Sequence, residues 1–133
     1  LYDKMVESGC VGMRFGVETF NIDVLKNIEK GIERRDFKKT LEYICLTYPE
    51  VMIHITMMSD MPGQTAEDTE IDMKIIKEMG FSNDNIFRTY QLSKCAPFPG
   101  TKLYEQMETK LDEATLKTYT LYDGGQDTIM KNL

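Results

Sequence analysis

Apolar residues follow two different spacings along this chain. Residues 11–17 and 51–58 alternate apolar and polar positions as a β-strand does, and residues 85–93 predict a third strand whose inward face the pattern leaves open. Between these runs, apolar residues recur every three or four positions, as they do on one face of a helix. The predicted helices cover residues 1–8, 22–30, 37–48 and 65–79, and a last helix begins near residue 101.

The order of these elements predicts an α/β fold. Strands that are separated by helices pair in parallel through right-handed crossovers. In such sheets, ligands bind at the carboxyl ends of the strands. Glu18 stands at that end of the first predicted strand, and Asn21, a good helix N-cap, follows it. Residues 11–18 and the helix after them therefore predict a ligand site.

One face of each of the first two predicted strands is partly polar. Arg14, Gly16 and Glu18 share a face of the first strand, and His54 and Thr56 share a face of the second. Parallel strands that are buried on both faces usually read as unbroken apolar runs. This face is therefore expected to line water, a ligand or a missing partner.

Composition places the chain among soluble globular proteins. It has 133 residues, of which 41% are hydrophobic and 29% charged, which suits one domain or a piece of one. No apolar run approaches the roughly 20 residues of a membrane helix, and the first residues lack the order of a signal peptide. A cytoplasmic protein without a membrane partner is expected.

Charge and cysteine content exclude two further classes at this level. A net charge of −6 argues against a nucleic-acid surface, which gains its affinity by neutralising phosphates, so no nucleic acid is expected as a partner of this segment. The three cysteines, Cys10, Cys45 and Cys95, are too far apart for a disulfide framework or a metal clip. Reduced, buried thiols are the simpler interpretation, and they agree with the cytosol.

Three motifs follow one another along the chain. They are FGVETFN at residues 15–21 with VLKNIEKG at 24–31, MPGQT at 61–65 with Glu67 and Asp68, and APFPGTKLY at 96–104. Together they resemble signatures of the radical S-adenosylmethionine superfamily over about residues 1 to 108. The resemblance is specific to the subgroup of cobalamin-dependent members, the anaerobic coproporphyrinogen oxidase type and the methylthiotransferases. Residues 121–125 (LYDGG) look more like the cobalamin-dependent members.

The resemblance implies a specific architecture. The three strands would be strands four to six of an open six-stranded, partial TIM-type barrel, so residues 1–108 would be the second half of the core domain and residues 109–133 an extension. Three strands are too few to close a barrel by themselves. Because the chain begins inside a helix, a three-stranded parallel βα fragment without its amino-terminal half is expected.

Two cofactor contacts are implied by the end of the first strand and by its helix. In the family, the residue that ends strand four contacts the ribose or amino-acid part of S-adenosylmethionine, which places this role on Glu18. A carboxylate can accept bonds from hydroxyls or an ammonium. Glu18 could instead cap the following helix or pair with Arg14. Lys30 matches a basic residue that pairs with the cofactor carboxylate in some members, although a lysine near a helix C-terminus also suits the helix dipole.

The second strand carries the other implied cofactor residues. Thr56 matches the ribose-binding position of strand five, and Pro62 lies in the Pro-Gly turn that follows. Asp60 departs from the family, which commonly has glycine there, and this puts the close approach of the backbone to the cofactor in doubt. His54 lies on the face of Thr56, and a lone histidine is more often a packed or solvated side chain than a catalyst.

The cluster that starts the family's reaction is not encoded in these residues. A [4Fe–4S] cluster needs a Cys-x-x-x-Cys-x-x-Cys loop, and the three cysteines cannot imitate that spacing. No catalytic residue and no metal ligand is therefore expected here, and the isolated chain should be inactive. In the intact enzyme, the cofactor would give a 5′-deoxyadenosyl radical that acts on a small-molecule or unidentified substrate, and a cobalamin in a separate domain stays open.

A non-catalytic alternative also fits the residues. The chain could be a self-contained α/β binding or interaction module in which Glu18 and Thr56 belong to an ordinary polar sheet face. If the first half of a barrel is absent, a parallel sheet edge is left open, and open edges pair with other chains. Self-association of the fragment through this edge is expected.

Overall fold

The computed structural model describes residues 1–28, 37–95 and 100–105, and the chain divides into two compact units, Leu1–Ser93 and Lys94–Leu133. The first unit holds nearly all of the described structure. Its strands are β1 (Gly12–Glu18), β2 (Met52–Ser59) and β3 (Arg88–Lys94), the last of which ends one residue into the second unit. The helices are α1 (Tyr2–Glu7), α2 (Ile22–Asn27), α3 (Phe37–Thr47), α4 (Ala66–Glu78) and, in the second unit, α5 (Lys102–Glu105).

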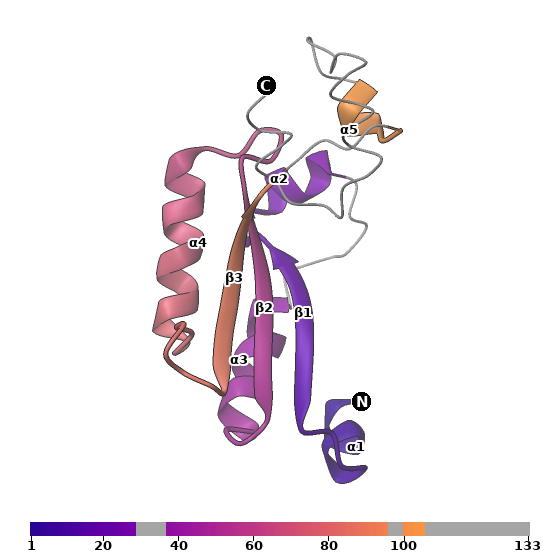
Figure 1. Ribbon diagram of the computed structural model, residues 1–133, viewed down its shortest axis with the longest axis vertical. Coiled ribbons are helices and arrows are strands. Elements are labelled where there is room, and N and C mark those ends of the chain that lie inside the picture. Colours follow the sequence, from indigo (N-terminus) through magenta and orange to yellow (C-terminus); the bar gives the residue numbers. More distant parts are fainter. Residues whose placement is uncertain (29–36, 96–99, 106–133) are drawn as a thin grey trace, which may run out of the picture. The chain divides into compact units, whose positions relative to one another are not determined.

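The three strands form one parallel sheet in the order β1-β2-β3 (Figure 1). The pairing of β1 with β2 runs in register from Gly12 opposite Met52 to Gly16 opposite Thr56. The predicted α/β class and the predicted parallel sheet are therefore confirmed. Within the described residues β1 is an edge strand, which is the edge for which self-association is predicted.

The third strand begins three residues later than the apolar pattern predicts. Asn85 closes a turn instead, because its side-chain oxygen accepts a hydrogen bond from the Phe87 amide at 3.0 Å and its carbonyl accepts one from the Arg88 amide at 3.1 Å. Asparagine commonly makes such turns with its own backbone, in competition with a strand ladder. The strand therefore starts at Arg88.

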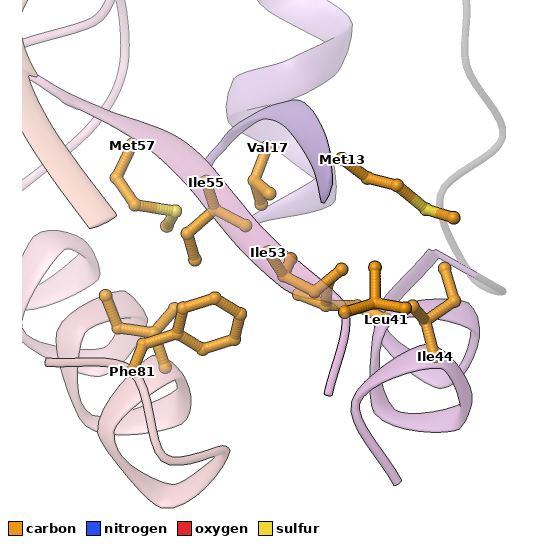
Figure 2. Close-up of a cluster of buried hydrophobic side chains, with 10 residues drawn as sticks. Met13, Val17, Leu41, Ile44, Ile53, Ile55, Met57 and Phe81 are labelled. Carbon is orange, nitrogen blue, oxygen red and sulfur yellow. The ribbon is translucent and has the colours of Figure 1, made fainter. Parts of the chain in front are cut away.

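One face of the sheet forms the core (Figure 2). Side chains at alternate positions of β1 and β2 are buried, as the period of two requires. Leu41 and Ile44 from α3 and Ile76 from α4 join the same cluster, so both helices cover this face. The buried cluster consists of Met13, Val17, Leu41, Ile44, Val51, Ile53, Ile55, Met57, Ile76 and Phe81.

The opposite face of the sheet carries the polar residues that the sequence places there. Arg14 is exposed, and His54 and Thr56 are half-buried. The structure also shows which residues of the third strand face the core, a point that the sequence left open. Arg88 is buried and Tyr90 packs against the core, which places Thr89 on the polar face beside His54.

Arg88 is a buried cation that serves as a junction between three elements. Its two terminal nitrogens donate to four backbone carbonyls: those of Cys45 and Tyr48 at the end of α3 at 3.0 Å each, and those of Val51 and Phe87 at 2.6 Å each. The residue is only 6% exposed. The last carbonyls of a helix lack partners within the helix and carry partial negative charge, so a guanidinium is well suited to them.

Both helices that start near the strand ends have side-chain caps, and the cap at Asn21 is the one that the sequence predicts. The Asn21 side chain accepts hydrogen bonds from the amides of Asp23 and Val24 and so begins α2. Thr65 and Asp68 form a reciprocal capping box that begins α4.

The other structural predictions from the sequence concern membrane helices, the cysteines, Lys30 and the carboxyl-terminal part of the chain. No helix in residues 1–28, 37–95 or 100–105 has the length and apolarity needed to cross a bilayer. The three cysteines are partly buried thiols, and burial raises the pKa of the Cys45 thiol against the lowering effect of Arg88. Lys30, residues 121–125 and the predicted extension at 109–133 lie outside the described residues.

Candidate cofactor site at the carboxyl ends of β1 and β2

Glu18 ends β1 in an unusual backbone conformation. Its φ of 66° lies in the left-handed region, and the Thr19 amide donates to the Val17 carbonyl at 2.9 Å, which closes a γ-turn around Glu18. The strand also bulges here, since Gly16 lies opposite Thr56 but Glu18 lies opposite Met57. Such irregularities change the direction of a side chain at a strand end and cluster at functional sites.

A buried carboxylate on α4 fixes the turn that follows Glu18. Asp72 is 3% exposed, and its Oδ1 atom accepts a hydrogen bond from the Phe20 amide at 2.8 Å. The Oδ2 atom of Asp72 is buried without a hydrogen bond within the described residues, and the Thr19 hydroxyl acts on this carboxyl by lowering its pKa. Burial raises the pKa of Asp72, and the bonds from Thr19 and Phe20 lower it only in part.

A second acidic residue of α4 holds the start of α2. The Asn21 side-chain amide donates to Asp68 at 2.8 Å, and Asp68 also caps its own helix through Thr65. The hydrogen bonds from Thr65 and then Asn21 lower the pKa of the Asp68 carboxyl. Asp68 and Asp72 are four residues apart and so lie on the same side of α4. Together they position the residues directly after Glu18.

Thr56 lies on the neighbouring strand at the same end of the sheet. It is half-buried, lies opposite Gly16 in the parallel register, and its hydroxyl donates to the Phe15 carbonyl at 3.4 Å. Glu18 is two residues further along β1. The structure therefore brings the two principal residues of the predicted site to the same end of adjacent parallel strands.

Asp60 follows β2 and repeats the conformation of Glu18. Its φ is 58°, and its side chain accepts a hydrogen bond from the Ser59 hydroxyl at 3.0 Å. This is a conformation that glycine adopts without steric cost and that aspartate tolerates better than most residues. The backbone here is thus the one that the resemblance implies for a glycine, and Asp60 adds an exposed carboxylate to it.

Replacing Asp60 with glycine is expected to leave the fold intact. The relief of the left-handed strain, about 1 kcal/mol, is offset by the greater freedom of glycine in the unfolded chain, so the free energy of unfolding should change by less than about 1 kcal/mol. Urea denaturation measures this change. Asp60→Val is the matched control, because a β-branched residue at this φ should cost more than 1 kcal/mol. Equal stability of the two variants would contradict this account of the turn.

The loop after Asp60 packs closely against α2. The Gln64 side chain accepts a hydrogen bond from the Met61 amide at 3.1 Å and donates one to the Met58 carbonyl at 3.0 Å. Asn27 of α2 donates to the Pro62 carbonyl at 3.2 Å, and a Cβ atom on Gly63 would lie 2.5 Å from the Asn27 amide nitrogen. The turn that contains Pro62 is therefore fixed by its backbone next to α2.

The side chains at this strand end are two hydrogen-bond acceptors and one hydroxyl. Glu18 and Asp60 supply carboxylates, and Thr56 supplies a group that donates or accepts. Such a set suits ribose hydroxyls or an ammonium group. Within the described residues, no group of three or more histidine, cysteine or acidic side chains is placed to hold a metal ion.

Sequence reasoning missed the residues that position the site. Asp72 lies four residues before Ile76, on the buried side of α4, and an acidic residue on an apolar helix stripe was an available signal. Thr19 and Phe20 gave no such signal, because their role depends on contacts with a helix more than 45 residues away.

His54 is a half-buried member of the polar sheet face. Its Nδ1 atom lies 2.8 Å from the Thr89 hydroxyl. Burial lowers the pKa of the imidazole, and the positive charge of Arg14 lowers it further. The ring is therefore neutral at pH 7, which agrees with a packed and hydrogen-bonded side chain.

No protein-family model matches the chain, but three curated relatives show weak similarity. The tRNA-2-methylthio-N(6)-dimethylallyladenosine synthase of Clostridium novyi is 27% identical over 105 residues, which cover 79% of this chain and 22% of that protein. The tRNA uridine(34) acetyltransferases of Methanocaldococcus infernus and Methanocaldococcus jannaschii are 25% and 26% identical over 103 residues, or 77% of this chain and 18% of theirs. The chain thus spans about a fifth of the length of these relatives.

The comparison corrects one expectation from the sequence. The net charge of −6 excluded nucleic acid, yet all three relatives carry names of enzymes that modify tRNA. The exclusion is wrong, because the net charge of a segment about a fifth as long as the relatives describes neither the rest of such a protein nor a local group of basic side chains. The chain is distantly similar to tRNA-modifying enzymes.

Proposed function

We propose that this chain is the cofactor-positioning half of a radical S-adenosylmethionine enzyme that modifies RNA. Glu18 and Thr56 would hold the ribose or amino-acid part of S-adenosylmethionine, with Asp60 and the Pro62 turn beside it. Lys30 would pair with the cofactor carboxylate. The observation that carries the proposal is the shared position of Glu18 and Thr56 at the carboxyl ends of adjacent parallel strands.

The residues around this strand end fit such a ligand. The conformations of Glu18 and Asp60 are costly for residues other than glycine, by about 1–3 kcal/mol each, and they persist because their surroundings fix them. For Glu18, the surroundings are the Asp72 and Asp68 hydrogen bonds from α4. A pre-formed acceptor at a strand end loses little freedom when it binds a ligand.

The proposal includes the architecture that the sheet by itself does not establish. The three strands would be the second half of an open six-stranded barrel, and the [4Fe–4S] cluster would be bound by residues outside this chain. When bound and reduced there, S-adenosylmethionine supplies a 5′-deoxyadenosyl radical for hydrogen abstraction. The residues of this chain would bind and orient the cofactor.

The substrate class comes from the comparisons. The subgroup that the sequence resembles includes the methylthiotransferases, and one relative is named as a 2-methylthio synthase that acts on tRNA. The other two relatives are also named for tRNA. We therefore propose RNA as the substrate, where the sequence alone left a small-molecule or unidentified substrate open.

The affinity of the full-length protein for S-adenosylmethionine tests the role of Glu18. Glu18→Gln removes the charge and should weaken binding about tenfold, which corresponds to the loss of one charge-assisted hydrogen bond. Thr56→Val should weaken binding by a smaller factor. Glu70→Gln is the matched control, since Glu70 is an exposed carboxylate on α4.

Two outcomes would remove the proposal. The first is equal affinity in the Glu18→Gln and Glu70→Gln proteins, measured by equilibrium dialysis. The second is the absence of a three-cysteine loop in the coding sequence roughly 100 residues upstream of Leu1, the distance that βα-unit lengths require. Either result would favour the alternative of a non-catalytic binding module.

A further inference from the structure

A second group of polar side chains crosses the open face of the sheet below the candidate cofactor site. Arg14 lies opposite His54 in the register of β1 and β2, and each is two residues, or about 7 Å, before the Gly16–Thr56 pair. The Arg14 guanidinium donates to the Gln91 side-chain oxygen at 3.5 Å, and His54 bonds Thr89. These four residues, Arg14, His54, Thr89 and Gln91, are called the polar row.

The polar row carries a positive charge that the described residues do not neutralise. Arg14 is exposed, and its hydrogen bond goes to a neutral amide. In residues 1–28, 37–95 and 100–105, the recorded ion pairs join Lys26 to Asp23 and Lys38 to Glu42, both on helices. A guanidinium in this position can present its remaining donors to an incoming anion.

His54 can add a directed donor beside that charge. In the neutral tautomer in which Nδ1 accepts a hydrogen bond from the Thr89 hydroxyl, the ring proton is on Nε2. The Gln91 amide, which donates to the Ser93 hydroxyl at 3.1 Å, keeps its oxygen toward Arg14. The hydrogen bonds across β2 and β3 thus fix the orientation of both Arg14 and His54.

We propose that the polar row binds a phosphate group of the RNA substrate, with Arg14 and His54 as the donors. The inference rests on the proposed function for the identity of the nucleic acid, while the anion site itself rests on the polar row. A guanidinium matches phosphate oxygens in pairs, and phosphate contacts set the register of a nucleic acid on a protein. A phosphate bound here would lie about 7 Å along the strands from the Gly16–Thr56 pair, on the side away from Glu18.

The single histidine of the chain makes the proposal directly testable by NMR. Because His54 is the only histidine, its imidazole protons give one assignable set of signals. The 133-residue protein at pH 7.5 is titrated separately with a short single-stranded oligoribonucleotide, inorganic phosphate and acetate. Saturable shifts of the His54 signals are expected with the oligoribonucleotide and, at millimolar concentration, with phosphate.

Charge-matched variants distinguish a site from a general effect of charge. Arg14→Gln should weaken the oligoribonucleotide titration by about fivefold or more, whereas Lys74→Gln, on the exposed side of α4, should leave it unchanged. Amide spectra establish that both variants keep the fold.

Four results would overturn the proposal. The first is that neither the oligoribonucleotide nor inorganic phosphate gives a saturable His54 shift up to about 10 mM, and the second is that the Arg14 and Lys74 variants weaken oligoribonucleotide binding equally. The third is a larger His54 shift with acetate than with phosphate. The fourth is a His54 shift with phosphate but none with the oligoribonucleotide. A further outcome is that S-adenosylmethionine fails to bind while the oligoribonucleotide still shifts the His54 signals and Arg14→Gln weakens that effect. This result would remove the proposed cofactor role and leave the polar row supported.

Discussion

Replacing Arg88 with methionine lowers the free energy of unfolding by about 3–5 kcal/mol, the range for removing one side of a buried charged interaction. The substitution removes the guanidinium donor from four buried carbonyls, of which those of Tyr48 and Phe87 keep the amides of Val51 and Ile53 as donors. Since domains of this size are stable by about 5–15 kcal/mol, the variant should lose a large part of its stability. Urea denaturation of the 133-residue protein measures the change.

Two further variants give this expectation its controls. Arg88→Lys keeps the charge but offers one nitrogen in place of two, so it should fall between the wild type and Arg88→Met. Lys74→Met removes a charge from the exposed side of α4 and should change the free energy of unfolding by less than about 0.5 kcal/mol. A loss below 1 kcal/mol in Arg88→Met would show that the four carbonyls find other donors.

Replacing Asp72 with alanine should destabilise the protein by about 2 kcal/mol and release the turn after Glu18. The Phe20 amide loses its acceptor, and the Thr19 hydroxyl loses a partner. Asp72→Asn retains an oxygen for the Phe20 amide and should cost less than about 1 kcal/mol. Glu70→Ala, an exposed carboxylate on the same helix, is the control.

Asp72 also gives the stability a defined dependence on pH. Burial raises its pKa in the folded protein above the ordinary value, so the native state binds this proton more tightly than the unfolded state does. The contribution of Asp72 to the free energy of unfolding is therefore largest at low pH and falls as the pH rises from the ordinary aspartate pKa through the raised one.

The difference between the wild type and Asp72→Asn isolates this effect from the other carboxylates. The stability of the wild type relative to that variant should decrease as the pH rises across this window. A difference that is constant with pH, or that increases, would show that Asp72 does not carry the buried charge inferred for it.

The sheet, its direction and its core face could be predicted from the sequence because they depend on local periodicity. Alternate apolar residues at positions such as Ile53, Ile55 and Met57 can only be buried together on one face. The caps at Asn21 and Thr65 could be predicted for the same reason, since a cap needs only residues within one helical turn.

The features that shape the candidate site depend on contacts between distant residues and could not be predicted. The residue after the γ-turn at Glu18 is held by a carboxylate from α4, and Arg88 is held by a carbonyl at the end of α3. The sequence marked Glu18, Thr56 and Asp60 by type and position. It could not show that two of them adopt the left-handed conformation.

The left-handed conformations of Glu18 and Asp60 bear both on the stability of the fold and on the proposed binding role of the strand ends. Residues in sparsely populated backbone regions are retained where their surroundings compensate, and such residues cluster at binding sites. Asp72 stabilises the residues after Glu18 even though its own second oxygen is unpaired and buried. This arrangement holds the backbone after Glu18 and leaves a buried oxygen of α4 unpaired.

The central claim is that S-adenosylmethionine binds at the carboxyl ends of β1 and β2. Amide chemical-shift mapping of the 133-residue protein with millimolar S-adenosylmethionine tests it most directly. We expect saturable shifts that are largest in residues 16–21 and 56–63 and that need about tenfold more ligand in Glu18→Gln. The absence of saturable shifts up to about 10 mM, or shifts confined to the outer sides of α3 and α4, would contradict it.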